Sequence, residues 1–257
     1  GAMNLAAGLR DPYLAKSPVL AFTGGRIPQT KFRKVYQEID DVPSFDQVTK
    51  FNATIDDAGR IPDMVRQAFR VATSGTPGHV HLQFAGNEGQ VDRGEADMDV
   101  LVEHDFDHVP PYRPEPELDR VKAAVKILAE AKKPVIVAGG GVRASGAGAE
   151  LVALAEKLQI PVATSLTGKD SITGDHPLSV GVGGSYSRIS ANRIVSEADL
   201  IFYVGSETGG MTTHFWQVPP IGTSSISLDI NPEQLGRNYP PKASVLGDAK
   251  VSLQKMI

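Results

Sequence analysis

An apolar run that breaks into three consecutive glycines limits the folds open to this chain. The run is KKPVIVAGGGVRASG, residues Lys132 to Gly146, and a helix is predicted to begin after it, around Ala147. A strand, a tight turn and a helix in this order are typical of an α/β fold, and glycines let a ligand approach bare backbone. Free N–H groups and the positive dipole end of the next helix attract phosphate. The segment therefore predicts a turn that holds a diphosphate.

The spacing of these glycines does not match the two best-known phosphate motifs. Gly139, Gly141 and Gly146 depart from the G-x-G-x-x-G dinucleotide pattern, in which the third glycine would replace Ala144. No Gly-Lys-Ser/Thr follows at the offset that a P-loop requires. A plain structural connection between strand and helix is therefore an equal alternative for this turn.

Length and composition indicate two globular domains and exclude several kinds of partner. The chain has 257 residues, of which 41% are hydrophobic and 22% charged. No apolar run approaches the roughly 20 residues of a membrane-spanning helix. A net charge of -4 with scattered Lys and Arg argues against nucleic acid, and the absence of cysteine excludes disulfides and thiolate chemistry. We expect a cytoplasmic protein with no membrane and no nucleic acid as partner.

The first block of the chain predicts a strand, a helix and a second strand. The first strand is PVLAFTGG, residues 18 to 25, and residues 79 to 84 alternate like a strand, with His79 and His81 on one side. Without a third ligand, these two histidines are predicted to pack inside the protein and not to bind a metal. The helix, residues 61 to 75, has an apolar stripe formed by Met64, Val65, Ala68, Phe69 and Ala72.

A stretch rich in proline and charge, EHDFDHVPPYRPEP at residues 103 to 116, predicts a linker between two domains. Beyond it strands and helices alternate, which implies a parallel sheet with right-handed crossovers. Ligands of such sheets lie beyond the carboxyl ends of the strands, where loops 139–141, 181–185, 205–210 and 229–232 would meet. The predicted elements are helix 117–131, strand 134–138, helix 147–158, strand 161–165, helix 189–197, strands 199–204 and 225–230, and a final helix from Asp248.

Six blocks, in order along the chain, resemble the thiamine-diphosphate-dependent acetolactate synthase family. They are GAMNLAAGLRDPYLAKSPVLAFTGG, YQEIDDVPSFDQVTKFN, IPDMVRQAFRVATSGTPGHVHLQF, KKPVIVAGGGV, LDINPEQLGRNY and LGDAK. The resemblance implies two three-layer α/β domains with parallel sheets, the second a Rossmann-like (DHS-like) central domain. Residues 1–104 would be part of the pyrimidine-binding domain, residues 105–116 the linker, and residues 117–257 the central, nucleotide-binding-like domain.

The resemblance also implies which parts of such an enzyme this sequence does not contain. Gly1-Ala2-Met3-Asn4 is in register with the end of the family's Gly-Pro-Gly-x-x-Asn motif, and the glutamate that activates the cofactor lies upstream of it. The Gly-Asp-Gly motif that binds Mg²⁺ and the diphosphate is also missing. No catalytic residue or metal ligand is therefore assigned, and the chain is expected to be an inactive fragment. The complete enzyme would bind thiamine diphosphate and Mg²⁺, decarboxylate a 2-keto acid, perform a carboligation, and form a homodimer or homotetramer.

Candidate site residues follow from their positions in the matching motifs. The resemblance places Asn4 and Gln37 near the cofactor, and Gln37 and Lys50 in the substrate channel. Without it, Gln37 and Lys50 would be interpreted as a surface amide and a solvated lysine. In the central domain the resemblance assigns contacts with FAD or an adenine nucleotide to Gly139, Gly140, Gly141, Gly181, Gly183, Gly184, Asp229, Ile230 and Asp248.

Glu207 departs from the pattern of the FAD-binding family members. Those members carry an arginine just after this strand, whereas a carboxylate that faces a diphosphate repels it. Asp229 also has a plain alternative role, which is to cap the turn at Asn231-Pro232. Two alternatives to the enzyme fragment therefore remain: a module that binds FAD or ADP, and a structural central domain without a ligand.

Overall fold

The computed structural model describes residues 1–86, 95–97 and 99–257. Contacts between Cα atoms divide the chain into two compact units, Gly1–Tyr112 and Arg113–Ile257, which we call the N-terminal unit and the central unit. The division falls inside the segment predicted as a linker. Within the described residues, no helix is long and apolar enough to cross a membrane.

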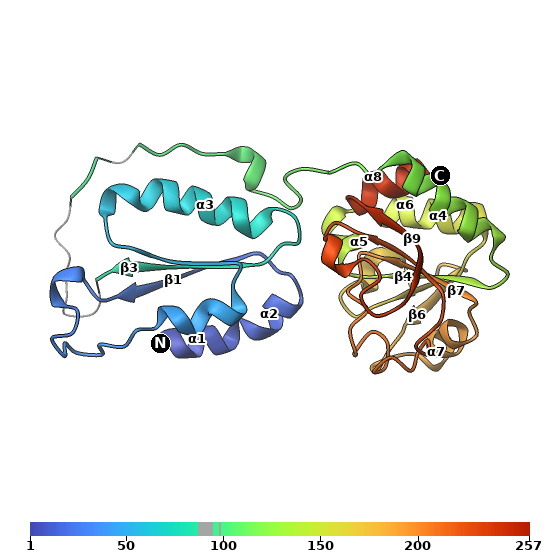
Figure 1. Ribbon diagram of the computed structural model, residues 1–257, viewed down its shortest axis with the longest axis horizontal. Helices are drawn as coiled ribbons and strands as arrows, with labels where there is room; N and C mark the ends of the chain where they lie inside the picture. The colour runs from blue at the N-terminus through green and yellow to red at the C-terminus, as the bar shows by residue number, and fades with distance from the viewer. Residues whose placement is uncertain (87–94, 98) are drawn as a thin grey trace. The chain divides into compact units, whose positions relative to one another are not determined.

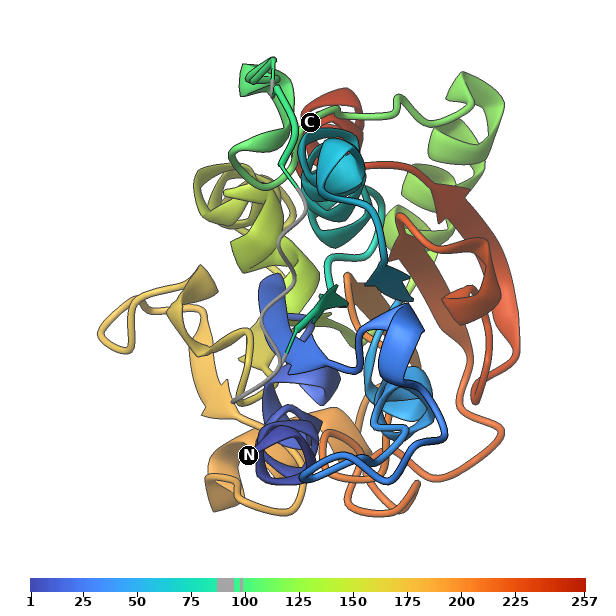
Figure 2. The same ribbon diagram turned by 90° about the vertical axis from the view of Figure 1, so that its left-hand side faces the viewer.

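The N-terminal unit contains a three-stranded parallel sheet. Its elements are α1 (Ala2–Gly8), α2 (Arg10–Leu14), β1 (Val19–Gly25), η1 (Pro28–Thr30), η2 (Val42–Val48), β2 (Phe51–Ile55), η3 (Ala58–Arg60), α3 (Ile61–Thr73), β3 (His79–Ala85) and η4 (His104–Phe106). The strand order is β1-β3-β2, with Ala21 opposite His81 and Asn52 opposite His81 on the other side. Figures 1 and 2 show α3 on one face of this sheet and α1 on the other. The helices thus leave the carboxyl edge of the strands accessible to the loops that follow them.

Helix α3 covers the apolar face of the sheet because small and aliphatic residues recur on one of its sides. Ala68 and Ala72 are fully buried, and Met64 and Val65 pack against the same core cluster. Phe69 was predicted in this stripe, but 42% of its surface is exposed. The two alanines bring the helix close to the sheet. The side of α3 that is buried is therefore narrow, and Phe69 lies at its border.

The central unit contains a six-stranded sheet in which every pair of neighbours is parallel. Its strand order is β6-β5-β4-β7-β8-β9. This arrangement confirms the predicted parallel α/β class. The elements are α4 (Leu118–Glu130), β4 (Pro134–Ala138), α5 (Gly140–Ser145), α6 (Gly148–Leu158), β5 (Val162–Thr164), η5 (Lys169–Ser171), β6 (Ser179–Val182), α7 (Ile189–Ser196), β7 (Leu200–Val204), β8 (Ser225–Asp229), η6 (Pro232–Gln234), β9 (Pro241–Leu246) and α8 (Ala249–Met256).

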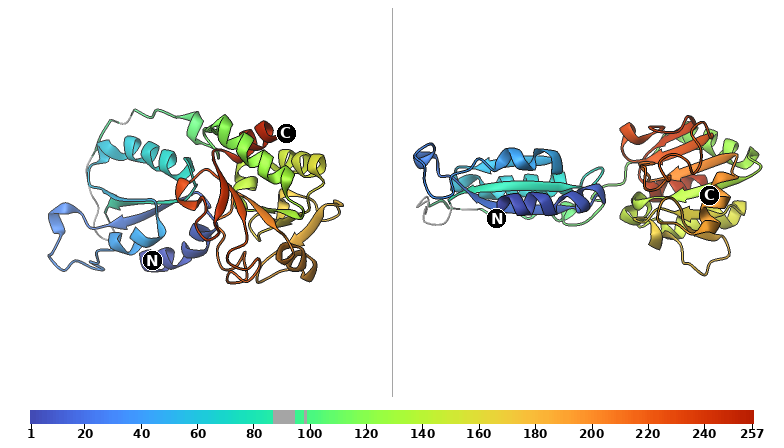
Figure 3. Two further views of the ribbon diagram at one scale, coloured as in Figure 1. Left: turned by 45° about the vertical axis from the view of Figure 1, so that its right-hand side comes forward. Right: turned by 90° about the horizontal axis from the view of Figure 1, so that it is seen from below.

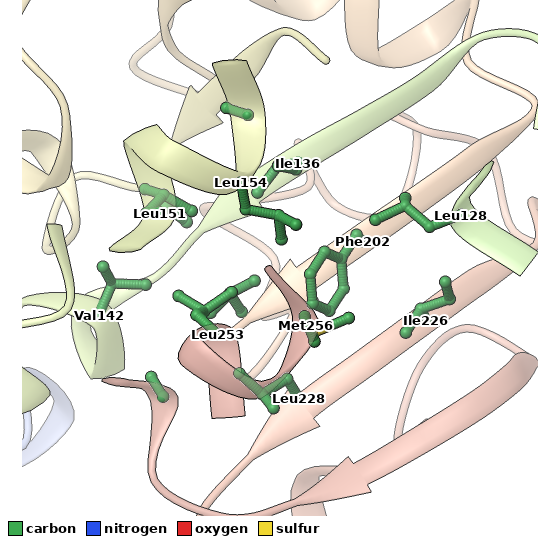
Figure 4. Packing of buried hydrophobic residues seen from close by; sticks show 14 of the residues in the cluster. Leu128, Ile136, Val142, Leu151, Leu154, Phe202, Ile226, Leu228, Leu253 and Met256 are labelled. Atoms are coloured by element: carbon green, nitrogen blue, oxygen red, sulfur yellow. The ribbon is translucent and has the colours of Figure 1, made fainter. Parts of the chain in front are cut away.

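The main core of the central unit lies between the sheet and helices α4, α6 and α8. Figure 4 shows Leu128 of α4, Leu154 of α6 and Leu253 of α8 gathered around Phe202 of β7, and all four are buried. Helix α7 covers the other face, where a smaller cluster forms (Figures 1 and 3). Helices on both faces leave only the ends of the strands for ligands.

Three features of the central unit were not predicted from the sequence. The triple-glycine turn does not lead directly to the helix at Ala147; it opens the short helix α5, which ends at Gly146 with a φ of 62°. Strands β6 and β9 were also missed, and both are edge strands. An edge strand has a neighbouring strand on one side only and carries fewer apolar residues. The pairing of β6 with β5 and of β9 with β8 also contains a shift in register.

The predicted linker is anchored at both ends, each to its own unit. Phe106 is buried under the guanidinium of Arg70, 4.5 Å from the ring centroid, and Arg70 also pairs with Glu103. On the central side, Arg113 lies 3.0 Å from the buried carboxylate of Asp248. The segment is therefore less solvated than its composition predicts.

Candidate functional site

A groove of about 470 Å³ lies at the carboxyl end of β1, the edge where parallel sheets bind ligands. It is lined by residues 1–5 at the start of α1, by residues 22–24 of β1, and by Gln37, Ile39 and Asp41 of the following loop. We call it the β1 groove. Asn4 and Gln37 come from segments about thirty positions apart in the sequence, and the fold brings both to this groove.

Ion pairs hold the loop that carries Gln37. Arg26, just after β1, lies 3.8 Å from the carboxylate of Glu38 and 3.4 Å from that of Asp40. Glu38 also accepts a hydrogen bond from the backbone N–H of Phe32. Gln37 itself has a φ of 54°, in the left-handed region that favours glycine. Because such a conformation persists only where its surroundings determine it, the anchored neighbours fix where the Gln37 amide emerges.

Polar side chains from all three strands lie beneath the β1 groove. Thr23 of β1 lines the groove, and its hydroxyl lies 2.8 Å from Nε2 of His81 on β3. The other ring nitrogen, Nδ1, lies 2.7 Å from Oδ1 of Asn52 on β2. The His81 ring is fully buried and stacks on Phe45 with 3.6 Å between ring centroids. Burial lowers the pKa of His81 to about 4, so the ring is neutral near neutral pH.

Thr23, His81 and Asn52 were not predicted as site residues from the sequence. A signal for them exists, because His79, His81 and Gln83 fall on one face of β3 while the other face of the sheet is apolar. A buried polar side chain needs hydrogen-bond partners, and Thr23 and Asn52 supply them to His81. The histidines were predicted to share one side of the strand, and they do.

Lys50 is not at the β1 groove. Its Nζ donates hydrogen bonds to the carbonyl oxygens of Val71, Ser74 and Thr76, at 2.6, 2.8 and 2.8 Å. These carbonyls lie at and just after the carboxyl end of α3, where an ammonium group is favoured by the helix dipole. Burial lowers the pKa of Lys50 from its ordinary value. The geometry thus gives Lys50 the role of a helix cap and does not bring it together with Gln37.

The triple-glycine turn of the central unit is packed against another loop of the same sheet edge. A Cβ at Gly139 would lie 2.1 Å from the carbonyl oxygen of Gly205, and a Cβ at Gly141 would lie 2.7 Å from its Cα. The N–H of Gly141 donates to the Gly205 carbonyl at 3.0 Å, and the N–H of Gly139 donates to Val204 at 2.8 Å. A Cβ at Gly140 would lie 3.0 Å from a neighbouring threonine hydroxyl. The N–H groups of Gly139 and Gly141 are therefore already paired within the protein.

In the second glycine loop, Gly184 is packed closely against another loop in the same way. A Cβ at Gly184 would lie 2.0 Å from the carbonyl oxygen of Met211, in the loop after β7. The N–H of Gly183 donates a hydrogen bond to the carbonyl oxygen of Thr164, the last residue of β5. Gly181 lies under the side chain of Arg188, whose Cδ would be 2.8 Å from an added Cβ. Gly184 thus allows two loops to approach one another closely.

Both aspartates assigned to this edge of the sheet have structural partners. Asp229 accepts a hydrogen bond at 2.9 Å from the backbone N–H of Asn231, which is the turn cap considered as its alternative role. Asp248 is 2% exposed and caps α8 through the first N–H groups of the helix. Its carboxylate also pairs with Arg113 and accepts a hydrogen bond at 2.7 Å from the Ser145 hydroxyl. The structure therefore directs Asp248 inward, toward the protein.

Glu207 and Ile230 follow β7 and β8 at this edge, and each is half-buried. Throughout residues 1–86, 95–97 and 99–257, no group of three or more His, Asp or Glu side chains could hold a metal ion.

Comparisons with known proteins agree on one family. A family profile described as "Thiamine pyrophosphate enzyme, central domain" matches residues 121–256. A "Probable acetolactate synthase large subunit" of Methanocaldococcus jannaschii is 36% identical over 261 residues, which cover 100% of this chain and 43% of that protein. An acetolactate synthase of Arthrospira platensis is 32% identical over 100% of this chain and 45% of that protein. The chain thus spans less than half the length of these curated relatives.

Solved structures show the same fold. The benzoylformate decarboxylase of Polynucleobacter necessarius superimposes with a TM-score of 0.76 at 20% sequence identity. The match covers 98% of this chain and 46% of that one. At this identity the comparison supports the fold of both units and carries no statement about activity.

Proposed function

Since the chain belongs to the thiamine pyrophosphate enzyme family, we propose that it is part of an acetolactate synthase-type enzyme, which decarboxylates a 2-keto acid and performs a carboligation. The observation that carries this proposal is the 36% identity to an acetolactate synthase large subunit along the entire chain. The N-terminal unit would be part of the pyrimidine-binding domain and the central unit the central domain. A homodimeric or homotetrameric assembly and a cytoplasmic location remain predictions of the same kind.

The β1 groove fits one side of a heterocyclic cofactor. Asn4 and Gln37, which both line the groove at the carboxyl edge of a parallel sheet, offer amide donors and acceptors. When bound, thiamine diphosphate supplies an electron sink for the carbanion left by decarboxylation. This chain's residues would bind and orient the ring and exclude water from it.

For the central unit we favour a structural role over the binding of FAD or ADP. The close contacts of Gly139 and Gly141 with Gly205, and of Gly184 with Met211, account for these glycines without a nucleotide. Titration of the chain with FAD and with ADP, followed by calorimetry, tests this role. We expect no saturable heat from either compound, and binding of either one would overturn the proposal.

A chimaera tests the proposed enzyme function. The matching segment of the Methanocaldococcus jannaschii relative would be replaced by this chain, and acetolactate formation from pyruvate measured with thiamine diphosphate and Mg²⁺. We expect activity that depends on the cofactor. If the chimaera assembles and binds the cofactor as the parent protein does, yet forms no acetolactate, the chain does not belong to an enzyme of this type.

Gln37 can be tested in the same chimaera. Replacement of Gln37 by alanine is expected to lower kcat/KM about tenfold, the loss of roughly one hydrogen bond in the groove. The matched control is Gln67→Ala, because Gln67 is an exposed amide on α3. Equal activity of the two variants would remove Gln37 from the proposed site.

A further inference from the structure

The side-chain amide of Asn52 has a single possible orientation. Its Nδ2 lies 2.5 Å from the carbonyl oxygen of Val42 and 2.8 Å from the carboxylate of Asp46. Both partners only accept hydrogen bonds, so the NH₂ group must face them. The carbonyl oxygen of the amide therefore faces His81, at 2.7 Å from Nδ1.

This orientation determines where the proton of His81 lies. Because Oδ1 of Asn52 only accepts, Nδ1 of His81 must carry the hydrogen and donate it. The buried ring is neutral, so Nε2 has a lone pair and no hydrogen. The hydroxyl of Thr23, 2.8 Å from Nε2, must then donate its hydrogen to the ring.

The single hydrogen of the Thr23 hydroxyl is thus directed away from the β1 groove. We propose that the relay Asp46–Asn52–His81–Thr23 makes Thr23 a positioning residue that only accepts hydrogen bonds in this groove, so that the groove selects a ligand edge with an N–H or O–H donor. The relay itself stands without the proposed function. Only the identity of the ligand, as an edge of cofactor or substrate, rests on it.

Packing keeps the relay in one state. The His81 ring lies parallel to Phe45, with 7° between the ring planes, so the imidazole cannot rotate out of the sheet face. His81 is fully buried, with 0% of its surface exposed. Water therefore does not compete for the hydrogen bonds of its ring nitrogens. A 180° ring flip would place Cδ2 against Asn52 and Cε1 against Thr23, so it would break both hydrogen bonds, which costs free energy in a buried site.

Nuclear magnetic resonance of the chain with ¹⁵N-labelled histidine tests the relay without any ligand or variant. We expect the coupling pattern of a neutral His81 with the proton on Nδ1 near neutral pH. A proton on Nε2, or an even mixture of the two forms, would overturn the relay. Replacement of Asn52 by leucine should shift His81 toward the Nε2–H form, with the ring-current shift from Phe45 reporting that the site is still folded.

Two matched probes test the selection of a donor. An aminopyrimidine and the methylpyrimidine of the same shape would be titrated into the chain, with the methyl resonance of Thr23 as the readout. The amine is expected to bind at least about tenfold more tightly, the difference made by one hydrogen bond. Equal binding of both probes, or no binding of either, contradicts the selection.

Variants at the same position separate hydrogen bonding from shape. Thr23→Ser keeps the hydroxyl and should keep the preference for the amine, whereas Thr23→Val should lose it. For Thr23→Val, binding is followed at the neighbouring Asn4 amide. A preference retained by Thr23→Val would mean that another group in the groove selects the donor. Failure of these tests would leave acetolactate formation by the chimaera unaffected, so the two proposals can fail separately.

Discussion

At the scale of single residues, the contact between Gly139 and Gly205 shows how little space the glycine turn leaves. A methyl group at position 139 would lie 2.1 Å from a backbone oxygen, which a side-chain rotation cannot relieve. Gly139→Ala is therefore expected to destabilise the central unit by about 3 kcal/mol. Urea unfolding followed by the fluorescence of Trp216, the only tryptophan, measures this change.

Gly174 provides the control for this substitution. It is exposed, has no neighbouring atom within 4 Å of an added Cβ, and does not have a positive φ. Gly174→Ala should leave the unfolding midpoint unchanged or raise it slightly, because alanine restricts the unfolded chain. If Gly139→Ala is equally harmless, the turn is more open than the contacts indicate and the nucleotide role returns.

His81 makes the stability of the N-terminal unit depend on pH. Its pKa is about 4 in the folded chain and 6.5 as the ordinary value, so the unfolded state binds the proton more tightly. Stability is therefore complete above about pH 6.5 and falls as the pH is lowered toward 4, by about 3 kcal/mol in total. Burial also lowers the pKa of His79, which acts in the same direction.

Denaturation of the chain by urea at several pH values, followed by circular dichroism, measures this dependence. The variant His81→Gln does not titrate in this range, so its stability should vary less between pH 6.5 and 4. An identical pH profile for the variant and the parent chain would show that other groups cause the acid sensitivity.

Motifs gave some single residues their predicted places, whereas other positions depend on contacts between distant parts of the chain. Asn4 and Gln37 were placed by their motifs, and the fold brings both to one groove. Lys50 was placed in the same channel, but its ammonium turns to the carbonyls that follow α3, which lie more than twenty positions away. No local pattern encodes that contact, nor the pairing of Thr23 with His81 across the sheet.

At the scale of elements, the start of α8 depends on one buried carboxylate. Asp248 accepts hydrogen bonds from the first N–H groups of the helix and pairs with Arg113, which anchors the end of the linker. Asp248→Ala removes the cap and leaves a guanidinium without its partner, so the central unit should lose about 3 kcal/mol. The shift of the urea midpoint, again from Trp216 fluorescence, measures the loss.

Asp119 is the matched control, an aspartate in the first turn of α4 that forms an exposed ion pair with Lys122. Asp119→Ala should not move the midpoint, because an exposed ion pair contributes little. Asp248→Asn should lie between the two, since an amide still accepts from the helix N–H groups but loses the charge that faces Arg113. A loss for Asp119→Ala as large as that for Asp248→Ala would contradict the role of burial.

Elements were predicted where the pattern is strong and lost at the edges of the sheet. Strand β4 was predicted with the bounds that the structure has, because its apolar run is buried on both faces. Strand β9 begins with the exposed Pro241 and Lys242, and β6 contains Gly181, so neither shows a continuous apolar run. Helix α5 was not predicted because it begins with two glycines, which are weak helix formers. Close packing against neighbouring residues requires glycine at these positions.

At the scale of the whole molecule, the cores predict that the two units fold separately. Among the described residues, the two core clusters of the central unit use only residues 121–256, and the two of the N-terminal unit lie before residue 83. A fragment of residues 113–257 keeps Arg113 and its partners. It is expected to unfold with the same midpoint and the same Trp216 emission as the complete chain.

A second fragment that begins at residue 117 lacks Arg113. It should be less stable than the longer fragment, because it has lost the same ion pair that Asp248→Ala removes. If the longer fragment does not fold, the central unit depends on contacts with the N-terminal unit, and the 136 residues matched by the family profile do not form an independent domain.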